Sequence, residues 1–221
     1  MERSNWLAEK RRETEERYTT LWAPTYGEEW GIYPNQSHQQ FLEKFLRLLP
    51  DHSRVLDAAC GAGRYMPMLL EQEHTVVGID QSEGMLASAR AKFPHVEMKK
   101  IGLPEMSFVE SFAGAICMDA MEHIFPEDWA PVFRNFHRAL KPYGCFYFTV
   151  EIAEEKEIEA AFATGQRAGL PIVYGEWAEN DGVYHYYPSM KQVREWTQQT
   201  SFDLIEEGEG NGYHHFLVRK A

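Results

Sequence analysis

The sequence predicts an α/β fold with a doubly wound, seven-stranded sheet that is mostly parallel and ends in an antiparallel C-terminal edge hairpin. Three observations support this prediction. Short apolar runs alternate with helical runs between residues 54 and 151, which is typical of a parallel sheet covered on both faces. A Gly-rich turn directly follows the first apolar run. The last two strand-like runs are joined by a short Gly-rich turn and must therefore pair antiparallel.

The first 50 residues are expected to form a helical cap. Aromatic and charged residues are frequent in residues 1–35, and four helix-breaking residues interrupt any long helix there: Pro24, Gly27, Gly31 and Pro34. Ser37 as N-cap and Gln40 three positions later form a capping box. The helix that they open carries an apolar face and ends before Pro50.

Residues 54–151 contain five predicted strands and three predicted helices. The strands are Val55–Ala59, Thr75–Ile79, Val96–Lys100, Gly114–Met118 and Cys145–Val150. The helices are Tyr65–Gln72, Glu83–Phe93 and Trp129–Leu140. Ser82 can cap the second helix, and the entirely apolar Gly114–Met118 is expected at the centre of the sheet.

After Glu151 the alternation becomes less regular. A polar helix is expected over Glu154–Ala168, and Asn180-Asp181-Gly182 is a hairpin turn signal between two short strands. Those strands and the closing elements are Val173–Trp177, Val183–Tyr187, the helix Ser189–Gln198, and the strands Phe202–Glu207 and Tyr213–Arg219.

Composition limits the possible function. A chain of 221 residues with 44% hydrophobic and 25% charged residues fits one globular domain. The net charge of −12 repels phosphate backbones and anionic lipid, so we expect neither a nucleic-acid nor a membrane partner. The charged N-terminal residues do not resemble a signal peptide, and Cys60, Cys117 and Cys145 cannot all pair, so a cytoplasmic location is expected.

The strongest motif is the turn Asp57-Ala58-Ala59-Cys60-Gly61-Ala62-Gly63 between a strand and a helix. Glycines let the backbone turn tightly and let a ligand approach closely. Met66 stands where a dinucleotide fingerprint requires its third glycine, which argues against a nicotinamide or flavin cofactor. Asp80 ends the second strand, where a carboxylate can accept hydrogen bonds from ribose hydroxyls. The alternative is that Asp80 caps the next helix.

Four segments resemble the motifs of class I S-adenosylmethionine-dependent methyltransferases of the small-molecule type. They are VLDAACGAGRY at 55–65, VVGIDQSEGML at 76–86, CMDAMEHI at 117–124 and LKPYG at 140–144. The resemblance implies a Rossmann-like fold, S-adenosylmethionine as cofactor and S-adenosylhomocysteine as product. It also implies a single domain over 1–221, with a cap (1–50), a cofactor-binding core (51–151), a substrate-side insertion (152–190) and closing elements (191–221).

The resemblance also implies which residues bind the cofactor. They are Tyr26, Asp57, Ala59, Cys60, Gly61, Gly63, Asp80, Gln81, Met85, Gly102, Leu103 and Met118. Lys99 and Lys100 stand where many members carry an acid, so side-chain recognition of the adenine amino group is not implied. Tyr143 replaces a usual glycine in a turn remote from the ligand.

Methyl transfer is an in-line displacement in which the protein aligns two reactants and removes a proton where the nucleophile carries one. His123 and Asp119 are the expected catalytic residues, and His185 is a second candidate base. The alternatives are a packed histidine at 123 and a structural or cofactor-binding role for Asp119 or its neighbour Glu122. No metal is expected, because the adjacent His214 and His215 point to opposite faces of a strand.

Residues 1–35 and 170–187 are both rich in aromatic residues and are expected to roof the crevice over the methyl group. Packing of one segment against the other is the simpler alternative. The leading expected function is methylation of an oxygen or nitrogen nucleophile on a small-molecule metabolite by a monomer or homodimer. The alternatives are a non-methylating enzyme that uses the same cofactor and a non-catalytic adenosyl-ligand binding module. The sequence specifies neither the substrate nor the methylated atom.

Overall fold

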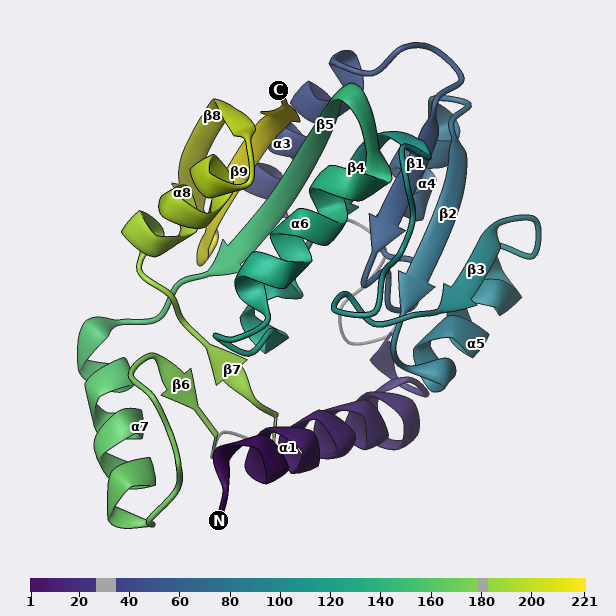
Figure 1. The fold of residues 1–221 in the computed structure, drawn as a ribbon. Coiled ribbons are helices and arrows are strands. Elements are labelled where there is room, and N and C mark those ends of the chain that lie inside the picture. The colour runs from purple at the N-terminus through teal and green to yellow at the C-terminus, as the bar shows by residue number, and fades with distance from the viewer. Residues whose placement is uncertain (27–34, 179–182) are drawn as a thin grey trace.

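The computed structural model describes residues 1–26, 35–178 and 183–221 and contains a seven-stranded sheet in the order β3-β2-β1-β4-β5-β9-β8 (Figure 1). Its strands are β1 (Arg54–Ala58), β2 (Thr75–Asp80), β3 (Glu97–Lys100), β4 (Phe112–Cys117), β5 (Leu140–Glu151), β8 (Phe202–Gly210) and β9 (Tyr213–Lys220). The strands β3, β2, β1, β4 and β5 pair in parallel, whereas β9 pairs antiparallel with β5 and with β8. The predicted fold class is therefore confirmed.

Helices cover both faces of the sheet. The helices that flank the sheet are α3 (Gln36–Arg47), α4 (Met66–Glu71), α5 (Glu83–Lys92), α6 (Trp129–Ala139) and α8 (Met190–Gln199). Alternate residues of β1 pack on opposite sides: Leu56 faces a core that includes α6, and Val55 faces a second core that includes α3 and α4. Burial on both faces explains why the central strands are continuous apolar runs.

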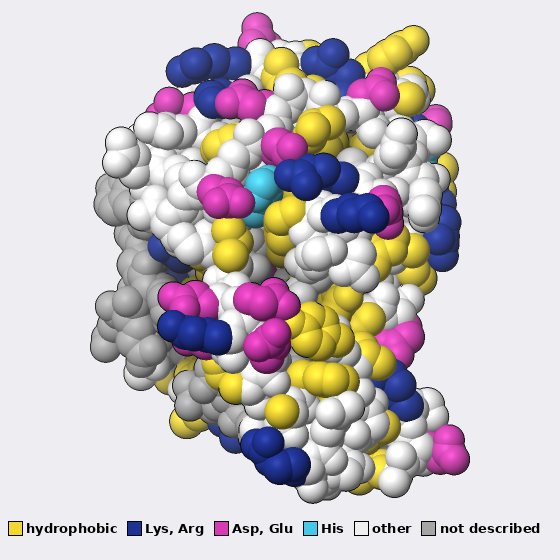
Figure 2. All heavy atoms as spheres, turned by 90° about the vertical axis from the view of Figure 1, so that its left-hand side faces the viewer, with side chains coloured by type: hydrophobic (Ala, Val, Ile, Leu, Met, Phe, Trp, Pro, Cys, Tyr) yellow, Lys and Arg dark blue, Asp and Glu magenta, His cyan; other side chains and the backbone are white. Residues whose placement is uncertain are grey.

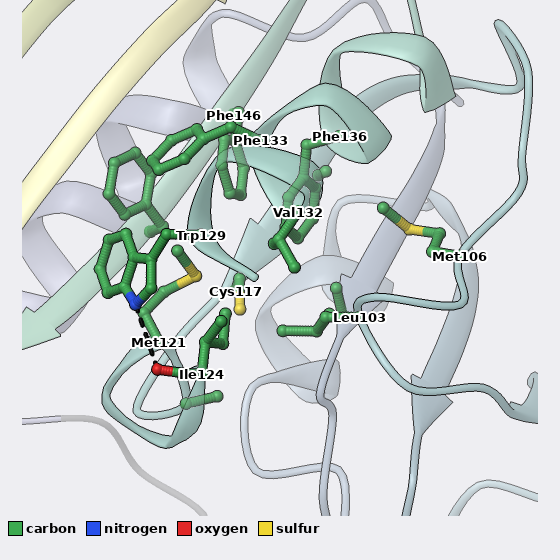
Figure 3. Close-up of a cluster of buried hydrophobic side chains, with 14 of the residues drawn as sticks. Leu103, Met106, Cys117, Met121, Ile124, Trp129, Val132, Phe133, Phe136 and Phe146 are labelled. Atoms are coloured by element: carbon green, nitrogen blue, oxygen red, sulfur yellow. Dashed lines mark hydrogen bonds between the residues drawn. The ribbon is translucent and has the colours of Figure 1, made fainter. Parts of the chain in front are cut away.

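The core between α6 and the sheet also fixes the segment that follows β4. Figure 3 shows Val132, Phe133 and Phe136 of α6 beside Cys117 of β4, all of them fully buried. The indole Nε1 of Trp129 donates a hydrogen bond to the carbonyl oxygen of Ile124 at 3.2 Å. This bond joins the start of α6 to the end of the short 3₁₀ helix η2 (Met121–His123) and so holds η2 at the carboxyl end of β4.

One prediction about the N-terminal part is wrong, the N-cap of α3. The preceding 15-residue helix, α1 (Arg3–Arg17), continues into the π-helix η1 (Tyr18–Trp22), and this helical run ends before Pro24. The N-cap of α3 is Asn35, whose side chain accepts a hydrogen bond from the backbone N–H of His38 at 3.0 Å. Ser37 lies inside the helix and donates its hydroxyl to Asn35, so Asn35 takes the capping role that Ser37 was expected to have.

The segment 152–190 contains α7 (Glu155–Arg167), β6 (Glu176–Trp177) and β7 (His185–Tyr186). β6 and β7 pair antiparallel as predicted, but each has only two residues. The expected turn at 180–182 lies outside the described residues. In Figure 1, α1 runs along the edge to which the arrowheads of β1 and β2 point, with β6 and β7 beside its N-terminal end. The cap and the insertion therefore meet at the carboxyl edge of the sheet.

Trp6 and Arg3 hold α1 in this position. Trp6 is only 1% exposed and packs edge-on against Tyr184, with 6.1 Å between ring centroids. The guanidinium of Arg3 forms an ion pair with Glu176 at 2.8 Å, and the Glu176 side chain is fully buried. Among the described helices, none combines the length and apolar character needed to cross a bilayer.

Candidate active site

A pocket opens at the carboxyl ends of β1, β2 and β4, and α1 and η1 form part of its wall. The carboxyl edge of an open parallel sheet is the usual place for such a crevice.

Most of the expected site residues line this pocket. They are Tyr26, Ala59, Cys60, Gly61, Asp80, Gln81, Met85, Gly102, Leu103, Met118, Asp119 and His123. Asp57 and Gly63 are not among its lining residues. The structure therefore brings most of the expected residues together from five separate parts of the chain, while their contacts with a cofactor stay a prediction.

Gly61 and Gly63, in the loop after β1, are each required to be glycine for a different structural reason. Both have positive φ, +51° at Gly61 and +81° at Gly63. A Cβ added at Gly63 would lie 2.7 Å from the Phe93 ring, so close packing requires that glycine. A Cβ at Gly61 would meet nothing within 4 Å, because the backbone there faces the pocket. Gly61 is thus the position at which a ligand can approach the main chain.

Asp80 is held in a fixed orientation by the backbone. Its Oδ2 accepts a hydrogen bond from Gly61 N at 2.9 Å, and its Oδ1 accepts one from Ser82 N at 2.7 Å. Burial raises the pKa of Asp80 to about 6, although these backbone hydrogen bonds act in the opposite direction. The N-cap of α5 is Ser82, which accepts a hydrogen bond from Met85 N, so Asp80 is not the N-cap of this helix.

Asp57 lies in β1 behind the glycine loop and is only 2% exposed. Its Oδ2 is buried and has no hydrogen-bond partner among the described residues. Burial, with the nearby charge of Asp80, raises the pKa of Asp57 to about 8. A buried acceptor of this kind costs stability unless a ligand or an ordered water satisfies it.

Asp119 follows β4 in the left-handed region, with φ +52°. Its carboxylate accepts hydrogen bonds from His38 Nε2 at 2.6 Å, from Arg64 at 3.2 Å and from the hydroxyl of Tyr65. Burial alone would raise its pKa, but these donors together hold the pKa below its usual value. A carboxylate with three donors is stabilised in its charged form, so the geometry favours an electrostatic anchor and does not support Asp119 as a base.

The partners of Asp119 were not predicted from the sequence. His38 is fully buried, and its Nδ1 lies 2.5 Å from Asn35 Oδ1. The His38 ring therefore links Asn35 at the start of α3 to Asp119 after β4. Arg64 and Tyr65 directly follow the glycine motif, and their position was the one signal that could have identified them.

His123 lines the pocket, but its ring is already engaged. Nδ1 lies 3.1 Å from the carbonyl oxygen of Tyr184, and Nε2 lies 2.8 Å from the hydroxyl of Tyr18. Burial, with a smaller contribution from His185, lowers the pKa of His123 to about 3. The imidazole is therefore neutral at pH 7. Its low proton affinity argues against a simple general base, for which a pKa near the working pH is optimal.

The other two candidates from the sequence lie behind His123. The ring of His185 is 4.8 Å from that of His123 but is not among the groups that line the pocket. Glu122 is 3% exposed, and burial raises its pKa well above the ordinary value. Neither group is placed to contact a ligand directly.

Known proteins resemble this chain in sequence and in fold. Residues 55–144 match the model of a methyltransferase domain. The solved structure of Burkholderia thailandensis 1,6-didemethyltoxoflavin-N1-methyltransferase, with bound 1,6-didemethyltoxoflavin and S-adenosylhomocysteine, covers 100% of this chain and 91% of its own at 17% identity, with a TM-score of 0.72. The matched segment and the methyltransferase relatives support a class I S-adenosylmethionine-dependent methyltransferase. S-adenosylmethionine is the cofactor of this class.

Two relatives show how far the sequence similarity extends. A demethylmenaquinone methyltransferase of Chlorobaculum parvum is 27% identical over 154 residues, which are 69% of this chain and 63% of that protein. An S-adenosyl-L-methionine-dependent Diels-Alderase of Talaromyces variabilis is 29% identical over 143 residues, which are 59% of this chain and 48% of that protein. The matched part spans less than two thirds of either relative.

The N-terminal part of this methyltransferase contributes more to the pocket than the sequence indicated. Arg11, Thr14 and Tyr18 line it together with Tyr26, whereas Trp30 and Tyr33 lie outside the described residues. Within 170–178 and 183–187, no described residue lines the pocket. The insertion instead supports the wall from behind, because the Tyr184 carbonyl holds His123 and the Tyr184 ring packs on Phe125 at 4.6 Å.

Over the part of the chain that the structure describes, no group of three His, Cys, Asp or Glu side chains could hold a metal ion. His214 faces Glu207 and Glu209 at 3.1 Å each, whereas the next residue, His215, contacts the hydroxyl of Tyr147 at 3.0 Å. The two histidines thus point in different directions, as strand geometry requires.

Proposed function

We propose that this chain transfers a methyl group from S-adenosylmethionine to an oxygen or nitrogen atom of a small-molecule metabolite by in-line displacement. The observation that carries the proposal is the carboxylate of Asp80. Two backbone N–H groups fix it at the carboxyl end of β2, inside the pocket and beside Gly61. An acceptor held in this way is suited to the two hydroxyls of a ribose.

The other cofactor contacts follow from the lining of the pocket. In the proposal, Met85 and Leu103 flank the adenine, and Gly61 lets the main chain approach the ligand. Met118 and Tyr26, which also line the pocket, are proposed to contact the methionine end of the cofactor. The unsatisfied carboxyl of Asp57 supports a ligand with a positively charged amino group nearby, since such a charge stabilises a buried carboxylate.

When bound, S-adenosylmethionine supplies a methyl group on a positively charged sulfur. The chain's own residues align the acceptor and keep water away from it. Ile124 and Phe125 are buried, apolar and part of the pocket wall, so they exclude water from the acceptor side. The negative charge of Asp119, which three donors hold in place, is proposed to stabilise the cationic end of the cofactor.

The proposal of a small-molecule acceptor rests on charge and on the relatives. A net charge of −12 opposes binding to nucleic acid. The demethylmenaquinone methyltransferase and the toxoflavin-precursor N1-methyltransferase are both named for small molecules. We propose for this chain only the general class of acceptor, a small molecule, and not the particular compounds that these relatives methylate. We also propose that residues 51–151 form the cofactor-binding core.

A second candidate is an enzyme that binds the same cofactor without transferring its methyl group. The similarity to the Talaromyces variabilis Diels-Alderase, which is named as S-adenosyl-L-methionine-dependent, supports it. The two candidates differ in one product, because only methyl transfer releases S-adenosylhomocysteine in proportion to substrate.

The experiment is incubation of the purified chain with methyl-labelled S-adenosylmethionine and fractionated metabolite extracts. We expect the label in one small-molecule fraction together with an equal amount of S-adenosylhomocysteine. The Asp80→Ala variant is the control for background transfer. Cofactor binding with no label transferred to any fraction would contradict methyl transfer and favour the second candidate.

A further inference from the structure

A hydrogen-bond chain of fixed direction ends at the hydroxyl of Tyr18 in the pocket wall. A backbone carbonyl only accepts hydrogen bonds, so Nδ1 of His123 must donate to the Tyr184 oxygen at 3.1 Å. In a neutral imidazole the other nitrogen then carries no hydrogen. Nε2 therefore accepts, and the Tyr18 hydroxyl donates to it at 2.8 Å.

The protonation states of both residues preserve this direction. Burial, with His185 next to it, keeps His123 neutral by lowering its pKa, while Asp119 acts in the opposite direction. Burial also raises the pKa of Tyr18 well above its ordinary value, and Tyr26, Glu122, Asp80 and Glu151 add to this effect. The Tyr18 hydroxyl thus keeps its single proton and donates it in the hydrogen bond to His123 Nε2.

The position of Tyr18 is fixed as well. Tyr18 begins the π-helix η1, and π-helices are rare and often occur at functional sites. The next residue, Thr19, contacts the hydroxyl of Ser82 at 3.0 Å. A Cβ at Gly84 would lie 2.4 Å from the Thr19 carbonyl oxygen, so η1 and α5 are in close contact. The backbone next to Tyr18 is therefore anchored on α5, and the hydroxyl of Tyr18 is held by His123.

We propose that Tyr18 determines substrate specificity by accepting a hydrogen bond from the acceptor molecule, which must therefore carry a neutral O–H or N–H group. With its own proton given to His123, the Tyr18 oxygen offers only lone pairs to a ligand. The adjacent wall, Ile124 and Phe125, is apolar and buried, which matches a hydroxyl or amino group on a hydrophobic body. This inference rests on the proposed function and specifies its substrate class.

The experiment compares two probes of similar shape, phenol and anisole, of which only phenol can donate a hydrogen bond. Both are titrated by ligand-observed NMR into the chain saturated with S-adenosylhomocysteine. Tyr18→Phe removes the accepting oxygen and keeps the ring. We expect this variant to lower the ratio of phenol affinity to anisole affinity about fivefold, the effect of one ordinary hydrogen bond.

Tyr147→Phe is the matched control. Tyr147 forms the same kind of hydroxyl–histidine pair with His215 at 3.0 Å, but it is buried in the core and is not among the lining residues. Its ratio should equal that of the unmodified chain. A second variant, His123→Leu, keeps the Tyr18 side chain but removes the group that accepts its proton. The Tyr18 hydroxyl can then donate toward the pocket, and the ratio of phenol affinity to anisole affinity should fall.

An unchanged ratio in Tyr18→Phe, an equal fall in Tyr147→Phe, or no binding of phenol to the unmodified chain would each overturn the inference. Saturation with S-adenosylhomocysteine precedes the probe titrations. If S-adenosylhomocysteine does not bind at that stage, the result contradicts the proposed function and not this inference.

Discussion

Asp57 is a buried carboxyl that the unliganded chain does not satisfy, and this predicts a pH-dependent stability. Its pKa rises from 3.8 to about 8 on folding, so the folded chain binds the proton more tightly than the unfolded chain. The contribution of Asp57 to stability is therefore present below about pH 4 and is lost as the pH rises to about 8. Asp80, with a pKa of about 6, acts in the same direction over a narrower range.

We expect Asp57→Asn to raise the free energy of unfolding at pH 8 by about 1–3 kcal/mol, because the amide cannot ionise and no charge has to be buried at that pH. The gain should be much smaller at pH 4. Urea unfolding at both pH values measures it, with the exposed Asp203→Asn as control. An equal gain at both pH values would mean that the charge of Asp57 is not the cause.

Asp80 predicts the strength of cofactor binding. Asp80→Ala removes an acceptor that two backbone N–H groups orient toward the pocket. Loss of two hydrogen bonds to a charged acceptor, which are not fully additive, should weaken binding by about 2–4 kcal/mol, or about 30- to 1000-fold. Calorimetric titration with S-adenosylhomocysteine measures this change. An unchanged dissociation constant in a folded variant would contradict the ribose-binding role.

Tyr143 lies near the start of β5, where the register with β4 is irregular and the backbone conformation favours glycine. Its φ is +63°, and its side chain is 76% exposed, so it loses little contact on removal. The left-handed conformation costs a residue with a Cβ about 1–2 kcal/mol. Tyr143→Gly should therefore raise the melting temperature by about 1–4 °C without changing cofactor affinity. Thermal unfolding followed by circular dichroism tests it, and a lower melting temperature would be the contrary result.

At the residue scale, the sequence was informative where the site residues lie in continuous motifs. Residues 57–63, Asp80, Met118 and His123 all belong to such segments. His38 and Tyr18 do not, because they reach the site only when α3 and η1 dock on the sheet. The spacing of residues around His38 and Tyr18 in the sequence does not indicate that these two elements pack against the sheet. The roles of His123 and Asp119 also depend on their hydrogen-bond partners, which the sequence does not specify.

At the scale of elements, α1 is the helix that the sequence did not predict. Its apolar side is narrow: Trp6 belongs to the core, and Leu7 is only partly buried. Such a helix shows little apolar periodicity, and much of its stability comes from tertiary contacts. The core strands, by contrast, were predicted because they are apolar on both sides.

The ion pair between Arg3 and Glu176 should be important for holding α1. Glu176 is fully buried and also accepts a hydrogen bond from the Tyr184 hydroxyl at 2.6 Å, while Arg3 is partly exposed. Arg3→Gln leaves the carboxylate without its cation, and we expect a loss of about 1–3 kcal/mol after allowance for this exposure. The melting temperature should fall by about 2–10 °C.

Arg12→Gln is the matched control, because Arg12 pairs with Glu16 on the exposed side of the same helix. Surface pairs of this kind contribute about 0–1 kcal/mol, so its melting temperature should change little. Equal effects of the two substitutions would show that the buried pair does not hold α1 in place.

At the scale of the whole molecule, the distribution of charge determines which partners the surface can attract. On the face shown in Figure 2, acidic and basic side chains are mixed, and hydrophobic side chains lie in several groups between them. No continuous basic surface is visible on this face. With a net charge of −12, the chain offers poor electrostatic complementarity to a phosphate backbone.

The central claim is that the pocket at the carboxyl ends of β1, β2 and β4 binds the adenosyl cofactor. Isothermal titration calorimetry of the purified chain with S-adenosylmethionine, S-adenosylhomocysteine and a nicotinamide dinucleotide tests it most directly. The account predicts dissociation constants on the order of micromolar for the first two, about −8 kcal/mol, and much weaker binding of the dinucleotide. Tight binding of the dinucleotide with no binding of either adenosyl ligand would contradict it.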